Sequence, residues 1–312
     1  MTQPERLYAY KNHHMDSARW DSFTPRADDI VIATSYKSGT TWMQTIIANL
    51  IFEGGALPAP PMAMSPWLDM RAFPIEEIVA QLDAQQHRRF IKTHLPLDAL
   101  PYYPQIRYIM VGRDPRDVAM SMLNHHNNFT DQALALLNQF AQTEEERLPP
   151  PFESARAFWR AHMAKGTVPW ESDGWPFWSS IRYAQTWWEH RHQPNILLVH
   201  YNDLLADPEG EIRRVAAYLG IERGAAEIAR IVEATSFASM KARADDITGE
   251  FGEMIWKGGA KTFINKGVNG RWREHFDAHD LALYENAVSR TLTPDCRDWL
   301  ENGRLARHET AA

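Results

Sequence analysis

Short, uninterrupted apolar runs alternate with helix-like segments along this chain, and this alternation restricts the possible folds more than any other feature. Strands are expected at 29–36, 90–93, 106–112 and 195–201, and helices at 41–52, 115–125 and 208–219. Continuous apolar runs are typical of parallel strands that are covered on both faces, and the intervening helices supply the crossovers. The sequence therefore predicts an α/β fold of three layers around a central, mainly parallel sheet.

One long segment interrupts the alternation. Residues 129–180 are rich in proline, glycine, tryptophan and acidic residues, and we expect them to form an irregular insertion in a single domain of residues 1–312. Long irregular segments are often functional, so the insertion is interpreted either as the wall of a binding pocket or as core. Its aromatic residues fit both interpretations: Phe158, Trp159, Trp170, Trp175, Phe177 and Trp178. A second weakly patterned segment, 241–267, is expected to stay mobile until a ligand binds.

Charge and composition exclude several classes of function. The formal net charge is −7, which argues against nucleic acid as the main partner, because binding to a phosphate backbone needs an excess of Lys and Arg. The single cysteine, Cys296, cannot form an intramolecular disulfide and suits a reducing compartment. The sequence has neither a signal-peptide pattern nor an apolar run of about 18 residues. We expect a cytoplasmic protein without a transmembrane segment.

The turn after the first predicted strand has the composition of an anion-binding site. It reads Lys37-Ser38-Gly39-Thr40-Thr41-Trp42 and leads directly into a helix. A turn that contains glycine exposes successive N–H groups, and the start of the helix adds the positive end of its dipole. A capped helix start with an incidental lysine is the alternative, but it does not require a strand, a lysine, a glycine and paired threonines together. The turn therefore predicts a phosphate-binding loop.

Such a loop also occurs in ATP-dependent kinases of the P-loop type, which remain an alternative. Their pattern places a glycine, four residues and then Gly-Lys-Ser/Thr. Here Lys37 precedes the only glycine of the turn by two positions. No predicted strand ends in the acidic residue that would hold a metal ion, and no metal site is expected.

Four segments resemble the cytosolic-type sulfotransferases, which use 3′-phosphoadenosine 5′-phosphosulfate (PAPS). The turn at 37–42 is similar to the family's 5′-phosphosulfate loop, 90–96 to its catalytic strand end, 108–121 to its 3′-phosphate strand and helix, and 265–272 to a late loop over the same phosphate. The segments have the family's order and spacing. The resemblance implies a P-loop-like fold and transfer of a sulfuryl group to a hydroxyl of a small, apolar or aromatic acceptor. Adenosine 3′,5′-bisphosphate (PAP) is then the leaving product.

Three residues are the candidates for catalysis. Sulfuryl transfer, like phosphoryl transfer, develops negative charge on the leaving phosphate, and Lys37 suits its neutralisation as a movable point charge. The resemblance implies that Lys92 contacts the sulfuryl oxygens. His94 is the candidate general base, because its usual pKa is near 6.5 and it follows a strand end, where α/β sheets place ligands. A catalytically inactive PAPS- or PAP-binding protein would need neither Lys92 nor His94.

The remaining candidates would hold the nucleotide. Arg113 and Ser121 match the family's pair for the 3′-phosphate, and arginine offers paired planar donors to phosphate oxygens. Asp114 and Arg116 are interpreted only as a helix cap and a local ion pair. The other implied contacts are Ser38, Gly39, Thr40 and Thr41 for the 5′-phosphate, Asn265, Lys266 and Gly267 for the 3′-phosphate, and Trp42, Tyr201 and Thr235 near the adenine.

The sequence departs from the family's pattern in three places. Asn265 stands where the family commonly has arginine, so we expect this contact to be weaker or to be supplied by Arg271 or Arg273. Ser35-Tyr36 replaces the usual Tyr-Pro before the loop. The dimer motif of many animal members is not recognisable at 273–281, so a homo-oligomer has no support from the sequence.

The paired histidines invite a metal interpretation. They are His13, His14, His125 and His126. Because no third ligand lies at a suitable spacing, we interpret them as surface groups or as groups behind the site.

Overall fold

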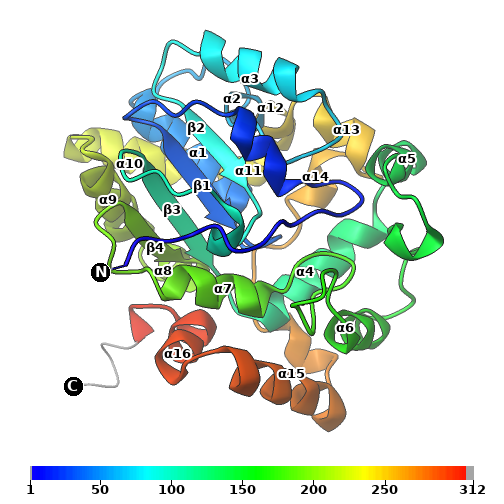
Figure 1. The fold of residues 1–312 in the computed structure, drawn as a ribbon. Coiled ribbons are helices and arrows are strands. Elements are labelled where there is room, and N and C mark those ends of the chain that lie inside the picture. Colours follow the sequence, from blue (N-terminus) through cyan, green and yellow to red (C-terminus); the bar gives the residue numbers. More distant parts are fainter. Residues whose placement is uncertain (1, 307–312) are drawn as a thin grey trace.

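Four parallel strands form the central sheet of the computed structural model, which describes residues 2–306 (Figure 1). They are β1 (Ile30–Thr34), β2 (Phe90–Thr93), β3 (Arg107–Gly112) and β4 (Ile196–His200), in the order β2-β1-β3-β4. The chain passes from β1 outward to β2 and then returns beyond β1 to β3. The strand order therefore reverses between β1 and β3, where open α/β sheets bind their ligands at the carboxyl edge. The predicted parallel α/β fold is confirmed.

Alternate side chains of the strands face two separate cores. Ile30 and Ile32 pack with α1 (Thr40–Ile51), α9 (Pro208–Leu219) and α10 (Ala225–Ala234). Val31 and Ala33 face the opposite core, which contains side chains of α4 (Pro115–Asn127), α7 (Ser180–Trp188), α15 (Ala278–Thr291) and α16 (Pro294–Asn302). This arrangement produces the three layers that the continuous apolar runs predict.

A buried ion pair fixes the register of β1 and β2. Arg89 and Asp29 precede the two strands, and both are almost fully buried. Arg89 Nε donates to Asp29 Oδ1 at 2.7 Å, and a second guanidinium nitrogen donates to Oδ2 at 2.5 Å. With this pair in place, Lys92 lies beside Ile32 in the sheet and Thr93 beside Ala33. The segment after β2 is thus brought next to the turn after β1.

The insertion at 129–180 is partly helical. It contains α5 (Asp131–Asn138), the 3-10 turn η3 (Glu144–Glu146) and α6 (Ala155–Ala164). Four of its aromatic side chains are buried in the same core as Val31 and Ala33: Phe158, Trp159, Phe177 and Trp178. Segment 241–267 likewise contains short helices, α12 (Ala244–Thr248), α13 (Phe251–Ile255) and α14 (Ala260–Phe263), and its mobility stays a prediction.

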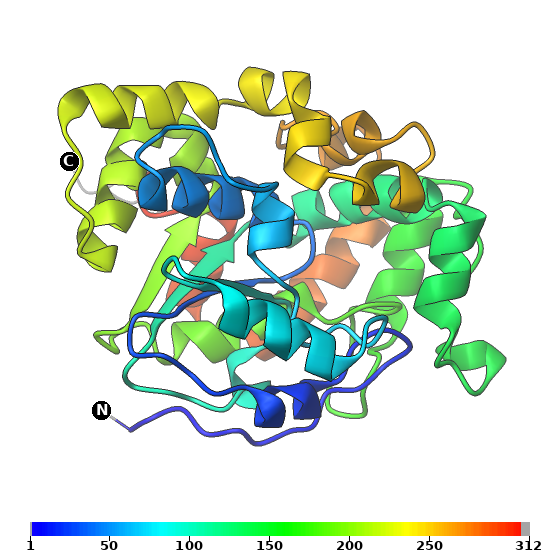
Figure 2. The ribbon, with the colours of Figure 1, turned by 90° about the horizontal axis from the view of Figure 1, so that it is seen from above.

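The remaining elements lie outside the sheet. Figure 2 shows the yellow-to-orange segment of α10 to α14 along one side of the molecule. Completing the chain are α2 (Pro61–Met64), α3 (Ile75–Ala84), α8 (Tyr201–Ala206), α11 (Phe237–Ala242), η1 (Ser17–Ser22), η2 (Leu97–Ala99) and η4 (Arg271–Glu274). Tyr201, expected at the end of a strand, instead begins α8, because His200 Nδ1 accepts from the Asn202 amide and caps this helix.

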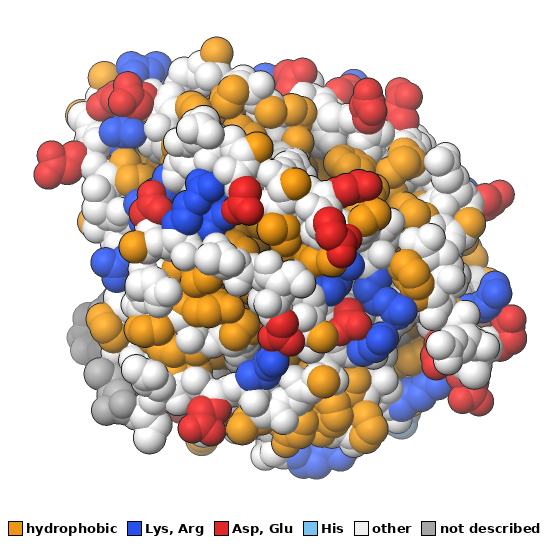
Figure 3. Space-filling model, turned by 45° about the horizontal axis from the view of Figure 1, so that its top comes forward, with side chains coloured by type: hydrophobic (Ala, Val, Ile, Leu, Met, Phe, Trp, Pro, Cys, Tyr) orange, Lys and Arg blue, Asp and Glu red, His pale blue; other side chains and the backbone are white. Residues whose placement is uncertain are grey.

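Acidic and basic side chains are interspersed with apolar ones on the face shown in Figure 3. Within residues 2–306, none of the helices combines the length and the apolar character that crossing a membrane requires.

Candidate active site

A cavity of about 490 Å³ opens at the carboxyl edge of the sheet. Its floor is formed by residues that directly follow the four strands, in the place where α/β sheets bind ligands. Most of the predicted site residues line this one cavity: Lys37, Gly39, Thr40, Thr41, Trp42, Lys92, His94, Arg113, Ser121, Tyr201, Asn265, Lys266 and Gly267. Ser38 and Thr235 are the predicted residues that do not line it.

The turn after β1 lines the cavity and contains two residues with positive φ. Lys37 has φ 60° and Gly39 has φ 112°. A Cβ atom at Gly39 would lie 3.1 Å from the ring of Tyr201, so a glycine is required both for the conformation and for this close approach. Thr40 begins α1. The first amides of a helix lack partners within the helix, and this edge of the cavity therefore presents donors to an anion.

Two lysines face the cavity over aromatic rings. Lys37 Nζ lies 3.9 Å from the centre of the Phe263 ring, and Lys92 Nζ lies 4.0 Å from that of Trp67. Removal from water lowers the pKa of Lys37 to about 7, and the charges of Lys92 and Arg113 act in the same direction. Removal from water also lowers the pKa of Lys92 to about 8, although the carboxylate of Asp69 opposes this shift. Within residues 2–306, neither lysine forms a salt bridge with a carboxylate. These two cations thus have no counter-ion from the protein, and a bound anion could serve as one.

The imidazole of His94 is held in one tautomer. Its Nδ1 lies 2.9 Å from the carbonyl oxygen of Thr34, and because a carbonyl only accepts, Nδ1 carries the proton. The ring is sandwiched between Tyr36, which stacks on it at 4.4 Å, and Trp67, which meets it edge-on at 4.8 Å. Burial holds the pKa of His94 well below its usual value, and the charge of Lys92 adds to this. The unprotonated Nε2 is thus left as a proton acceptor on the cavity side.

A chain of hydroxyls connects this histidine with the phosphate-binding turn. Thr34 Oγ1 lies 3.1 Å from His94 Nδ1 and 2.6 Å from Thr40 Oγ1. The side chain of Thr40, at the start of α1, is therefore directly linked to Thr34, which orients the ring of His94.

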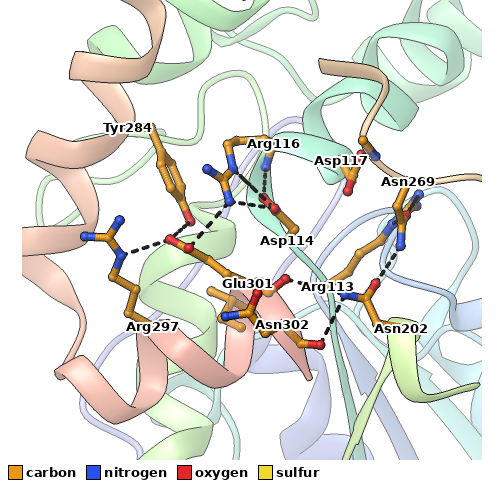
Figure 4. A network of polar contacts seen from close by, with 12 residues as sticks. Arg113, Asp114, Arg116, Asp117, Asn202, Asn269, Tyr284, Arg297, Glu301 and Asn302 are labelled. Carbon is orange, nitrogen blue, oxygen red and sulfur yellow. Dashed lines mark hydrogen bonds and ion pairs between the residues drawn. The ribbon is translucent and has the colours of Figure 1, made fainter. Parts of the chain in front are cut away.

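Arg113 is fixed by amide oxygens and by an aromatic ring. Its Nε and one terminal nitrogen donate to Asn269 Oδ1 at 3.0 and 2.7 Å, and the other terminal nitrogen donates to the carbonyl of Lys37 at 3.0 Å. The guanidinium lies 4.1 Å from the centre of the Tyr201 ring. Asn269 in turn donates to Asn202 Oδ1 at 2.6 Å, and this arrangement is visible in Figure 4. Arg113 is thus oriented without being neutralised by a carboxylate at salt-bridge distance.

The interpretation of Asp114 and Arg116 as a helix cap with a local ion pair is confirmed. Asp114 accepts from the backbone amide of Arg116 at 2.9 Å and forms a paired contact with its guanidinium (Figure 4). Tyr284 and Glu301 flank this pair, so Arg116 points away from the cavity.

The late loop closes the end of the cavity beside Arg113. Gly267 has φ 65°, and a Cβ atom there would lie 2.3 Å from the ring of Phe237. The amide of Gly270 donates to Asp117 Oδ1 at 2.6 Å, which ties the loop to α4. Asn265 lines the cavity, and its carbonyl accepts from Lys241 Nζ.

Ser38 and Thr235 use their hydroxyls within the protein. Ser38 Oγ lies 2.5 Å from Ser35 Oγ, and Thr235 Oγ1 donates to the carbonyl of Ile231 at 2.7 Å. Both residues are buried, and their contacts with a nucleotide stay predictions. Trp42 and Tyr201 meet edge to face at 5.3 Å on the cavity wall.

The other half of the cavity is predominantly apolar. Its wall includes Met62, Trp67, Met70, Phe73, Ile78, Phe129, Leu137, Phe177, Phe251, Met254 and Trp256. Of the six aromatic residues singled out in the insertion, Phe177 is the one on this wall, so within the described chain most of that aromatic cluster is core. Of the two interpretations of the paired histidines, that of surface groups is wrong for His13, His14 and His126, which are buried; His14 and His125 line the cavity.

Several residues of the site lack a signal in the sequence. Trp67 and Asp69 lie in a segment without a motif, yet Asp69 Oδ2 accepts from the indole of Trp67 at 2.7 Å and thereby orients the ring under Lys92. Asn269 belongs to a recognised segment but is not one of its expected contacts. Among the described residues, no group of three His, Cys, Asp or Glu side chains is arranged to hold a metal ion.

Fold and site together define a group-transfer enzyme of the phosphate-binding α/β class. The sulfotransferase domain family matches residues 27–293, and the chain belongs to this family. A glycolipid sulfotransferase of Mycobacterium tuberculosis is 36% identical over 308 residues, which cover 95% of this chain and 94% of the relative. Sulfotransferase 1A1 of Rattus norvegicus is 28% identical over 282 residues, with 88% of each chain covered.

Solved structures confirm the fold. A mouse sulfotransferase in complex with PAP superimposes with a TM-score of 0.67 at 23% identity, covering 95% of this chain and 93% of that one. Retinol dehydratase in complex with retinol and PAP gives a TM-score of 0.68 at 25% identity, covering 89% and 85%.

Proposed function

We propose that this chain transfers the sulfuryl group of PAPS to a hydroxyl of an apolar or aromatic acceptor. The observation that carries the proposal is the meeting of three cations without carboxylate partners, Lys37, Lys92 and Arg113, with the unprotonated nitrogen of His94 in one cavity. A site that leaves several enclosed cations unpaired is stabilised by a polyanionic ligand. The same cavity continues into an apolar chamber, which suits the acceptor.

The proposed contacts with the nucleotide are made by residues along the cavity wall. The turn at 37–41 would hold the 5′-phosphate, Trp42 and Tyr201 would flank the adenine, and Arg113 with Ser121 would hold the 3′-phosphate. Each of these residues except Ser38 lines the cavity. The late loop at 265–271 would then close over the 3′-phosphate.

The proposed chemical step is an in-line displacement at sulfur. The acceptor oxygen forms a bond to sulfur while the bond from sulfur to the bridging oxygen of the 5′-phosphate breaks, and PAP leaves with that electron pair. His94 Nε2 takes the proton of the attacking hydroxyl. Lys37 would neutralise the bridging oxygen, and Lys92 the sulfuryl oxygens.

The acceptor is proposed to be large and apolar around its reacting hydroxyl. Methionine and aromatic side chains dominate the wall that faces His94, from the loop before α3 to α13. The name of the mycobacterial relative, a glycolipid sulfotransferase, supports lipid-sized acceptors. A kinase activity has less support, because the chain belongs to the sulfotransferase family. A purely binding function would leave the placement of Lys92 and His94 without a purpose.

The proposal is tested by titrating the protein with PAP and then assaying labelled PAPS with phenols, sterols, glycolipids and long-chain alcohols. We expect tight PAP binding and a sulfated product with at least one apolar acceptor. Tight binding without any product would favour the inactive binding protein. A rate that EDTA abolishes and magnesium restores would favour the kinase.

A further inference from the structure

His125 lines the acceptor half of the cavity and has no role in the proposed sulfuryl transfer. It lies on α4, and the indole Nε1 of Trp256 donates to its Nδ1 at 3.0 Å. An indole N–H can only donate, so Nδ1 of His125 must be the acceptor. A neutral imidazole then carries its proton on Nε2. Removal from water, followed by the charges of Lys37 and Lys92, keeps the pKa of His125 well below its usual value, so the ring is neutral at physiological pH.

The two imidazoles of the cavity are therefore complementary. In His94 the carbonyl of Thr34 fixes the proton on Nδ1, which leaves Nε2 as an acceptor. In His125 the indole of Trp256 fixes the opposite tautomer, which leaves Nε2–H as a donor. Among the described residues, no protein group pairs with Nε2 of either ring.

His125 lies close to the proposed centre of reaction. Its ring is 4.8 Å from that of Phe129 and 5.4 Å from that of Trp256, both on the apolar wall. It is also 5.9 Å from the ring of Phe263, and Lys37 Nζ lies over that same ring. His125 is thus a polar group between the aromatic side chains of the apolar wall and the ring over which Lys37 lies.

We propose that His125 Nε2–H donates a hydrogen bond to a second oxygen of the acceptor, placed next to the hydroxyl whose proton His94 removes. This inference rests on the proposed function and narrows its substrate class to alcohols that carry an ether, hydroxyl or carbonyl oxygen beside the reacting group. An acceptor without that oxygen leaves an N–H group unpaired in an apolar wall, and such a group is costly.

The test compares two alcohols of the same length, decyloxyethanol and tridecanol, which differ by one ether oxygen in place of a methylene. With labelled PAPS, we expect the wild-type enzyme to have a kcat/KM roughly tenfold higher for decyloxyethanol. His125→Phe keeps a ring on the wall but removes the donor, so the preference should fall to about one, through loss of activity on decyloxyethanol alone. An equal loss for both alcohols would overturn the proposal and make His125 a packing residue.

His126 supplies a matched control. It is the next residue on α4, it is buried, and its Nε2 lies 3.3 Å from the carbonyl of Pro150 rather than in the cavity. His126→Phe should preserve the preference for decyloxyethanol. Loss of the preference in this variant as well would mean that any disturbance of α4 removes it, which contradicts a specific role of His125.

A second measurement does not depend on turnover. Long-range proton–nitrogen spectra of the PAP-bound protein with isotope-labelled histidine report the tautomer of each ring, and His94→Ala and His125→Phe assign the signals. We expect the proton on Nδ1 of His94 and on Nε2 of His125. A proton on Nδ1 of His125 overturns the inference. If the wild-type enzyme sulfates neither alcohol, the proposed acceptor class is wrong, and the spectra still decide the tautomer.

Discussion

His94 can act as a base near neutral pH because its other nitrogen is engaged with the main chain and its pKa is low. We expect His94→Ala to lower kcat by roughly 10²–10⁴-fold. The affinity for PAP, measured by calorimetry, should stay nearly unchanged. The loss should be greatest for an aliphatic alcohol and smaller for an acidic phenol that ionises unaided. A variant that sulfates an aliphatic alcohol at the wild-type rate would exclude His94 from the mechanism. Because the low pKa keeps the ring of the free enzyme unprotonated, protonation of His94 should lower kcat/KM only at a pH well below 6.5.

The two cavity lysines predict that nucleotide binding is linked to protons. In the empty cavity their pKa values are about 7 for Lys37 and about 8 for Lys92, and a phosphate beside them favours their charged forms. At pH 8 both lysines are partly deprotonated before binding, so the protein should take up about one proton when PAP binds. Calorimetry in buffers of different ionisation enthalpy measures this uptake, and PAP affinity should fall as the pH rises above about 7, the pKa of Lys37. Binding without proton uptake would contradict the low pKa values.

Single residues of the site differ in how readily the sequence predicts them. Lys92 lies near the end of β2, His94 and Arg113 directly follow β2 and β3, and Lys37 lies in the turn after β1. The ends of parallel strands share one edge of the sheet, so the convergence of these residues follows from the topology. Trp67 and Asp69 come from a segment without repeat or motif. Their place under Lys92 depends on tertiary packing, which no local pattern encodes.

In the late loop, Asn265 stands where the family commonly has a positively charged arginine, and a nearby arginine is expected to replace that charge. Arg271 lines the cavity and Arg273 does not. Arg113 lines the same cavity; burial lowers its pKa, and the positive charge of Arg271 acts in the same direction. Arg273 instead lies over the ring of Trp272 at 4.3 Å and is exposed.

Arg271→Ala should therefore weaken PAP binding about tenfold, the loss of one charge-assisted contact. Binding of adenosine 5′-monophosphate, which lacks the 3′-phosphate, should change little. Arg273→Ala, two positions along the same 3-10 turn, is the control and should leave both affinities unchanged. If Arg273→Ala instead weakens PAP selectively, the loop has a different register from the one described here.

The sequence predicts the four strands and the helices α1, α4 and α9, but not helices such as α3, α7, α10, α15 and α16. The strands at β1 to β4 and the helices α1, α4 and α9 agree with the sequence patterns to within one or two residues at most ends. The helices of 129–180 were missed, because proline, glycine and tryptophan obscure helical periodicity there. Tyr201 was assigned to a strand because nothing in the apolar run signals that His200 caps a helix.

At the scale of the whole molecule, the empty cavity carries a cost in stability. Lys37 has a pKa of about 7 in the folded protein and about 10.4 in an unfolded chain. Between these values the unfolded chain binds more protons, so the stability of the empty protein should rise with pH over this range.

Lys37→Met removes this charge and keeps an unbranched side chain. We expect the empty variant to be more stable than wild type at pH 7 by roughly 1 kcal/mol or more, as when buried charges are replaced by apolar groups. PAP, which should raise the Tm of the wild type, should raise that of the variant much less. Thermal unfolding with and without PAP checks both statements. A variant that is less stable than wild type when empty would show that Lys37 is stabilising rather than strained by its surroundings.

The hydrogen bond from His94 to a main-chain carbonyl has an evolutionary consequence. Every amino acid has such a carbonyl, so the orientation of the base survives any substitution of the Thr34 side chain that preserves β1. The apolar chamber, by contrast, is formed by side chains of the loops and helices outside the sheet. If His94 is the base, descendants of this chain can therefore exchange one substrate range for another while keeping the same proton acceptor. A mutant library confined to the chamber would explore new acceptors on a constant catalytic background.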